Sequence, residues 1–129
     1  KAAGKTGLSL DEAAEAGFEA EMVSMEDSAL PGYYKGGGEM AVRVTVEKSS
    51  GRVLGAQLMG DYTANIDKRL DILAVAVKAG LTAADLASLD LAYAPPFSNA
   101  LDLPIVAGNI AEAKVLGKTC SCTAEGLED

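Results

Sequence analysis

The residues best suited to chemistry in this 129-residue chain are tyrosines in loops rich in proline and glycine. Tyr33 and Tyr34 lie in "LPGYYKGGGE", and Tyr93 lies in "LAYAPPFSNALD" beside two prolines. A phenol can donate a hydrogen bond or a proton, and exposed aromatic side chains on a stiff backbone are candidates for binding or for an interface. The alternative is that each ring covers the core of its own domain and leaves only its hydroxyl in water.

Other common catalytic and metal-binding groups are scarce. The chain has no histidine, which excludes Ser-His-Asp and Cys-His arrangements within it and removes the usual zinc or haem ligand. Cys120 and Cys122 alone cannot complete a tetrahedral zinc site, and a redox role would need a lowered thiol pKa. The two "GKT" triplets, at 4–6 and 117–119, lack the upstream glycine of a phosphate-binding loop. We therefore expect no metal site and interpret the cysteine pair as incidental.

The charge balance excludes several classes of partner. A formal net charge of −8 and a pI near 4.5 would repel the phosphate backbone of nucleic acid and an anionic membrane surface. No apolar run approaches the length of a membrane span, and the first residues lack the apolar core of a signal peptide. We expect a cytoplasmic protein that binds neither nucleic acid nor membrane.

Strands are predicted where apolar and polar residues alternate. The clearest case is "MAVRVTVE" over 40–47, followed by a "KSSGR" turn and a return strand over 53–60, which predicts an antiparallel hairpin. A half-buried strand is predicted over 18–25, and its apolar face would hold Phe18, Ala20 and Met22.

Helices are predicted at four places: between Ser9 and Gly17, over 65–79, after Thr82, and from Pro104 onward. The helix over 65–79 carries an apolar stripe suited to packing on a sheet, made of Ile66, Leu70, Leu73 and Val77. Its second half is apolar nearly all round, which is typical of a helix covered on one side by a sheet and on the other by a second chain. Strands followed by helices, without regular alternation, predict an α+β fold: an antiparallel sheet of three or more strands with helices packed on one face.

The segment "LDLAYAPPFSNALD" resembles the C-terminal signature of FAD-dependent pyridine nucleotide–disulfide oxidoreductases, in the branch of coenzyme A-disulfide reductase, NADH oxidase and NADH peroxidase. The likeness extends over "GYY", "GRVLGAQLMG", "DKRLDILAVAVKAGLTAADLAS" and "AGNIAEAKVLG". It implies a dimerisation domain over 1–118 and a tail or the start of a linker over 119–129. The FAD- and NAD(P)H-binding domains and the redox cysteine would lie elsewhere in a longer chain. We expect this part alone to bind neither cofactor and to be inactive.

The resemblance also implies site residues. In this branch the dimerisation domain of one subunit lies over the flavin and the active cysteine of its partner in a homodimer, and contributes tyrosines near the thiol. Tyr93 matches one of them, and the other would be Tyr33 or Tyr34. Where relatives have proline and glycine after the paired tyrosines, this chain has Lys35 and Gly36, so the substrate is left open.

The rigid Pro95-Pro96 dipeptide predicts a subunit interface as well. It can present Tyr93 and Phe97 to another subunit with little loss of chain entropy. A competing hypothesis is a free-standing protein-interaction or small-ligand-binding module with the same α+β form.

Overall fold

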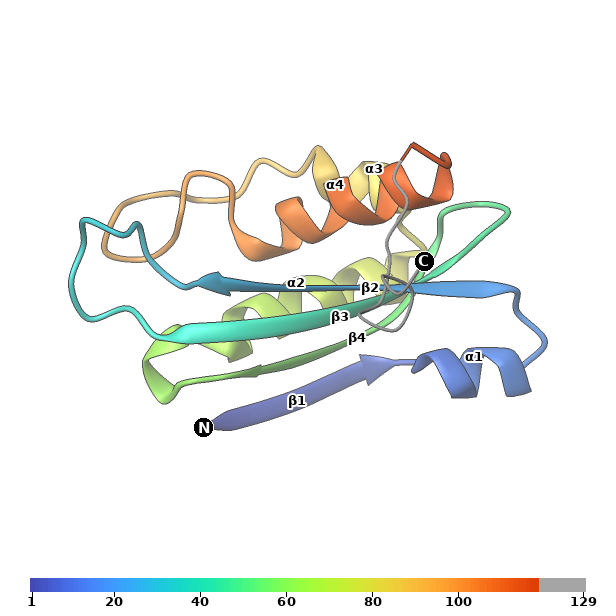
Figure 1. The fold of residues 1–129 in the computed structure, drawn as a ribbon, viewed down its shortest axis with the longest axis horizontal. Helices are drawn as coiled ribbons and strands as arrows, with labels where there is room; N and C mark the ends of the chain where they lie inside the picture. The colour runs from blue at the N-terminus through green and yellow to red at the C-terminus, as the bar shows by residue number, and fades with distance from the viewer. Residues whose placement is uncertain (119–129) are drawn as a thin grey trace, which may run out of the picture.

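The computed structural model describes residues 1–118 and contains a four-stranded antiparallel sheet in the order β1-β4-β3-β2 (Figure 1). The strands are β1 (Ala2–Gly7), β2 (Ala20–Ser28), β3 (Glu39–Glu47) and β4 (Val53–Gly60). The predicted hairpin is present as β3 and β4, whose register pairs Val42 with Leu58 and Val44 with Ala56. The predictions for residues 119–129, Cys120 and Cys122 included, lie outside the described residues.

The helices that follow the strands pack on one face of this sheet. They are α2 (Ile66–Ala79), α3 (Ala83–Ala87) and α4 (Leu103–Val115), and a single 3₁₀ turn, η1 (Tyr62–Ala64), leads into α2. Helix α2 lies over β1 and β4, helix α4 lies over β2 and β3, and α3 packs against α4. The predicted α+β fold, an antiparallel sheet with helices on one face, is confirmed.

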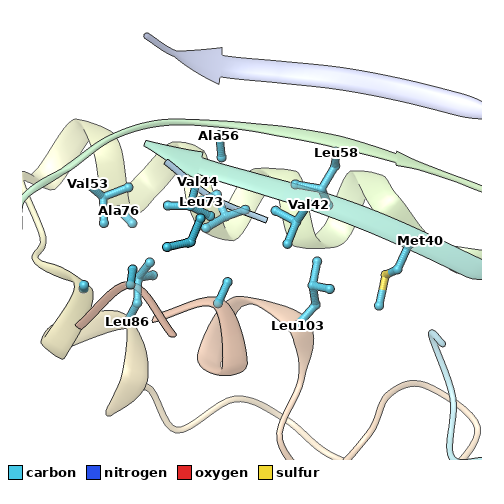
Figure 2. Close-up of a cluster of buried hydrophobic side chains, with 14 of the residues drawn as sticks. Met40, Val42, Val44, Val53, Ala56, Leu58, Leu73, Ala76, Leu86 and Leu103 are labelled. Atoms are coloured by element: carbon cyan, nitrogen blue, oxygen red, sulfur yellow. The ribbon is translucent and has the colours of Figure 1, made fainter. Parts of the chain in front are cut away.

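A single hydrophobic core fills the space between sheet and helices (Figure 2). The strands contribute small and β-branched side chains, and the helices contribute mainly leucine and alanine; the most deeply buried include Val44, Val46, Val53, Leu73, Leu86, Leu103, Ala107 and Ala111. The predicted stripe of α2 is confirmed, since Ile66 and Leu73 are buried while Leu70 and Val77 pack partly buried against the core. This core fixes the helices over the sheet and so sets the positions of the loops between them.

The chain between β1 and β2 crosses the other face of the sheet at one end. The backbone of Leu8 passes over Gly55 of β4, where an added Cβ would lie 2.2 Å from the Leu8 carbonyl oxygen. Thr45, the β3 partner of Gly55, is also buried there. Glycine at position 55 is therefore required by the close approach of two backbones.

Helix α1 (Leu10–Glu15) follows this crossing; Ser9 is its N-cap, as predicted, and forms a capping box with Glu12. The Glu12 carboxylate accepts a hydrogen bond from the Ser9 N–H at 2.8 Å and pairs with Lys5. Lys5 first, and the Ser9 N–H second, lower the pKa of Glu12 to about 2. Lys5 thereby ties α1 to strand β1.

Two features of the sheet differ from the sequence predictions. Strand β1 was not predicted at all, and the buried face of β2 is the opposite of the predicted one: Val23 and Met25 face the core, whereas Met22 alternates to the other side. The alternation in β2 is real, but both sets of side chains are partly apolar, so the period alone does not identify the inward set.

No helix in residues 1–118 has both the length and the apolar character needed to cross a membrane.

Candidate functional site

Two tyrosine-bearing loops lie together at one end of the sheet (Figure 1). The first covers residues 29–38 between β2 and β3, and the second covers residues 88–102 between α3 and α4. The Asn99 side chain of the second loop donates a hydrogen bond to the Ser28 carbonyl at the start of the first, at 2.8 Å. Two loops that are far apart in sequence are thus joined directly by a hydrogen bond.

The structure brings Tyr33 and Tyr93 together at this end. Both rings are accessible, with 76% and 49% of their surface exposed. A hydrogen bond with the Tyr93 hydroxyl is the main cause that raises the pKa of Tyr33 above its ordinary value, and desolvation adds to it. Such a shift is expected when the neutral phenol of Tyr33 donates to the Tyr93 oxygen, because ionisation would remove the donor.

Tyr34 is placed differently from its neighbour. Its backbone N–H donates to the Pro31 carbonyl at 2.8 Å and closes a tight turn at the tip of the first loop. Its ring is half-exposed, and the pair with Tyr93 is made by Tyr33. Of the two tyrosines that the sequence left as alternatives, Tyr33 is the one that the fold sets beside Tyr93.

A groove of about 580 Å³ borders Tyr93, and its walls come from the second loop and the start of α2. Its lining residues are Asn65, Asp67, Lys68, Ala92, Tyr93, Ala94 and Phe97. The predicted interface residues form one turn here: Phe97 donates from its backbone to the Ala94 carbonyl at 2.9 Å, with Pro95 and Pro96 inside the turn. The two prolines fix this turn and leave the Phe97 ring 63% exposed.

Beneath both loops lies a residue that the sequence analysis missed, Arg69 of α2. Its side chain is fully buried, and its Nε donates to Oδ1 of Asp102 at 2.9 Å. The guanidinium also donates to backbone carbonyls from several parts of the chain, namely those of Ala29, Ala64, Asn65 and Phe97. A signal was present: Arg69 follows Ile66 by three positions and precedes Leu73 by four, so it belongs to the stripe that faces the core.

In the described part of the chain, the other titratable groups do not gather into a metal-binding cluster. Within residues 1–118, no group of three or more carboxylate or cysteine side chains is placed to hold a metal ion. Acidic residues with lowered pKa values serve local structure instead; Asp85, for example, caps α3 through the backbone N–H of Thr82 and, to a lesser degree, its hydroxyl. The tyrosine pair and its groove are therefore the best candidate site in the described part of the chain.

The chain is similar in sequence to known proteins of one family. The chain is 37% identical over 107 residues to the NAD(P)H sulfur oxidoreductase (CoA-dependent) of Pyrococcus furiosus, which covers 83% of this chain and 24% of that protein. It is 38% identical over 86 residues to the coenzyme A disulfide reductase of Staphylococcus epidermidis, covering 67% of this chain and 19% of that protein.

A solved structure agrees with these relatives. The fold superposes on the NAD-dependent persulfide reductase from A. fulgidus with a TM-score of 0.87 at 37% identity, over 98% of this chain and 23% of that one. The chain thus spans about a quarter of the length of such proteins. Residues 2–104 match the family model described as the pyridine nucleotide-disulphide oxidoreductase dimerisation domain. The chain therefore belongs to the dimerisation-domain family of the pyridine nucleotide–disulfide oxidoreductases.

Proposed function

We propose that the full-length protein is a homodimeric NAD(P)H-dependent flavoprotein that reduces a disulfide or persulfide of coenzyme A, and that this domain supplies Tyr33 and Tyr93 to the active site of the partner subunit. The relatives named for coenzyme A-dependent sulfur and disulfide chemistry support the substrate class. Thiol-forming chemistry of this kind suits a reducing compartment, and we propose the cytoplasm.

The single observation that carries the proposal is the position of Tyr93, exposed at the wall of the groove and close enough to the exposed Tyr33 to raise its pKa. Two neighbouring phenols at a protein surface, one of them beside a groove, are poorly explained as cover for the core, because their rings face solvent. They suit a site that is completed by another surface. The family's dimerisation role supplies that surface in the form of a second subunit.

In this mechanism, a cysteine thiolate of the partner attacks one sulfur of the substrate disulfide. A new sulfur–sulfur bond forms to the cysteine as the original one breaks, and the other sulfur leaves as a thiolate. Tyr93 donates its proton to that leaving thiolate, and Tyr33, which donates to the Tyr93 oxygen, orients the phenol. The tyrosinate that remains is a transient state that regains a proton from solvent.

The cofactors FAD and NAD(P)H do not fit the residues of this domain. The sequence contains no G-x-G-x-x-G fingerprint, and the glycines at 36–38 lie in a loop between antiparallel strands rather than between a strand and a helix. We assign the cofactors to other domains of the full-length protein. The mechanism above uses no cofactor-binding residue of this domain.

The testing experiment replaces Tyr93 by phenylalanine in the full-length enzyme and follows disulfide reduction in a single turnover. Phenylalanine keeps the ring and its packing, so we expect an unchanged fold and a rate of disulfide cleavage lower by about 10²-fold, the contribution of one positioned proton donor. Tyr62→Phe is the matched control, since Tyr62 is an exposed tyrosine that does not line the groove. A Tyr93→Phe rate within about twofold of the native rate, well below that contribution, would refute the proposed role.

A further inference from the structure

We propose that Arg69 is a positioning residue for the reaction: its buried guanidinium holds the two tyrosine-bearing loops in fixed relation to each other. The inference rests on the proposed function, since it assigns Arg69 a role in the same site. It concerns a side chain that lies beneath the tyrosines and reaches neither the groove nor the solvent.

The hydrogen-bonding capacity of Arg69 is fully used. A guanidinium has five N–H donors in a rigid plane. Nε donates to Asp102 Oδ1 at 2.9 Å, and Nη1 donates to the carbonyls of Ala64 at 2.5 Å and Asn65 at 3.3 Å. Nη2 donates to the Ala29 carbonyl at 3.0 Å and reaches the Phe97 carbonyl at 3.5 Å. The side chain therefore has an acceptor for each of its donors.

The acceptors belong to the segments that build the site. Ala29 opens the loop that carries Tyr33, and Phe97 ends the proline turn that follows Tyr93. Ala64 and Asn65 form the turn between η1 and α2. A single group on α2 thus joins both tyrosine loops to a rigid helix.

Asp102 completes the arrangement as the counter-charge and as a helix cap. It is 2% exposed, and its Oδ1 accepts hydrogen bonds from both Arg69 Nε and the Leu103 N–H at the start of α4, each at 2.9 Å. Lys68, at 3.9 Å from Oδ2, adds a second positive charge from the edge of the groove. The second loop is therefore held at its end by Asp102 and in its middle by the Phe97 carbonyl.

The arrangement is suited to fixing positions because it anchors both loops from below, in addition to the Asn99–Ser28 hydrogen bond and the local turns at the surface. The first loop holds glycine at 32 and 36–38, and the rings of both tyrosines face solvent. Hydroxyl groups carried by such loops keep their mutual distance only if the loop bases are held. A shift of about 1 Å in a reacting group can lower a rate by about 10²-fold. Lysine at position 69 would present three donors from one nitrogen and lacks the planar fork that reaches carbonyls on several sides.

The test uses the full-length enzyme with Arg69→Met and Asp102→Asn combined. This pair of substitutions removes both buried charges together, which avoids leaving an uncompensated ion, and asparagine retains the cap on α4. The single variant Arg69→Lys keeps the charge beside Asp102 but loses the fork, and it carries the test if the combined variant does not fold. Arg52→Met, at an exposed arginine in the turn between β3 and β4, is the matched control.

The readout specific to positioning is the titration of Tyr33, followed by NMR of protein labelled with ¹³C at the tyrosine hydroxyl carbon and assigned with Tyr33→Phe. If Arg69 holds the loops, both Arg69 variants move the Tyr33 titration to lower pH, as Tyr93→Phe does, while dimerisation and flavin absorbance stay native. Disulfide cleavage slows by roughly 10- to 100-fold. Adding Tyr93→Phe to either variant slows it little further, because the two changes remove the same interaction.

An unchanged Tyr33 titration in a folded Arg69 variant overturns the positioning role, whatever happens to the rate. A full additional loss of rate when Tyr93→Phe is added also overturns it, since independent effects multiply. A Tyr33 titration that moves while neither Arg69→Lys nor Tyr93→Phe alters cleavage supports the positioning role and refutes the proposed catalytic function instead. The two proposals therefore fail in distinguishable ways.

Discussion

At the scale of single residues, the candidate site is distinguished by one exposed phenol with a raised pKa. Tyr33 has the raised pKa, and its main cause is the hydrogen bond with Tyr93. The neutral form of Tyr33 is therefore favoured in the folded state. The contact contributes to stability below the ordinary phenol pKa of about 10, and that contribution is lost as the pH rises through the higher pKa of the folded protein.

Replacing Tyr93 by phenylalanine should lower the Tyr33 pKa toward its ordinary value of 10.0, because the acceptor oxygen, the main cause of the shift, is gone while the ring remains. The change can be measured by titrating tyrosinate absorbance in Tyr33→Phe, Tyr93→Phe and native protein. Tyr34→Phe should leave the Tyr33 transition where it is. If Tyr34→Phe moved the Tyr33 transition as much as Tyr93→Phe does, the raised pKa of Tyr33 would not be due specifically to Tyr93.

The sequence identified the tyrosines but not their pairing. Tyr33 and Tyr34 are adjacent in a glycine-rich loop, and the ring that lies near Tyr93 depends on the turn at Pro31–Tyr34 and on the docking of the two loops. Arg69 was missed for a related reason: a charged residue is usually assigned to a solvated face, and the carbonyls that surround this one come from distant segments.

At the scale of helices and strands, the close packing of α3 against α4 depends on Gly108. An added Cβ at this position would lie 2.7 Å from both the Ala87 nitrogen and the Leu86 Cβ. Side-chain bulk is therefore excluded where the two helices touch, and α4 can approach closely enough to place Asp102 against Arg69.

Gly108→Ala should destabilise the domain by about 1–3 kcal/mol, the usual cost of inserting a group into a well-packed contact. Equilibrium urea unfolding measures this. Gly32→Ala is the matched control, since no atom lies within 4 Å of a Cβ added there and its φ is not positive. Equal stabilities of the two variants would show that α3 and α4 are not packed this tightly.

Most elements were predictable because their signals are local. Caps at Ser9 and Thr82, the glycine stop after α2 and the strict alternation in β3 all act within a few residues. Strand β1 was missed because "AAGKTG" has low intrinsic strand preference, and it becomes a strand only by pairing with β4. The predicted inward face of β2 was wrong because α4 covers one face of β2, and the tertiary fold, not the local sequence, decides which face that is.

At the scale of the whole molecule, the helical layer carries apolar side chains that the domain itself does not bury. Val75 on α2 and Phe97 in the proline turn are 65% and 63% exposed, and Leu101 before α4 is similar. An isologous interface needs one self-complementary patch, and the family is defined by dimerisation. These observations support the proposal that this face meets its copy in a two-fold dimer.

Phe97→Ala in the full-length protein should weaken dimerisation. A buried aromatic anchor typically contributes about 2 kcal/mol or more, which corresponds to a roughly thirtyfold higher Kd. Sedimentation equilibrium over a range of concentrations measures this directly. Met59→Ala, at a 55% exposed side chain on the opposite face of the sheet, is the control. If the Met59 variant dissociates and the Phe97 variant does not, the dimer uses the other face.

The order of strands in the sheet has a consequence for how the domain folds. Strands β2, β3 and β4 are neighbours in both sequence and space, whereas β1 pairs Ala2 with Gly60 across all the chain between them. Closing that long loop is entropically costly, so β1 should add last to a meander that has already formed. Its amides should then exchange with solvent hydrogen sooner than those of β3, through openings that leave the rest of the sheet intact. Equal protection of β1 and β3 in a native-state exchange experiment would instead mean that the sheet forms and opens as one cooperative unit.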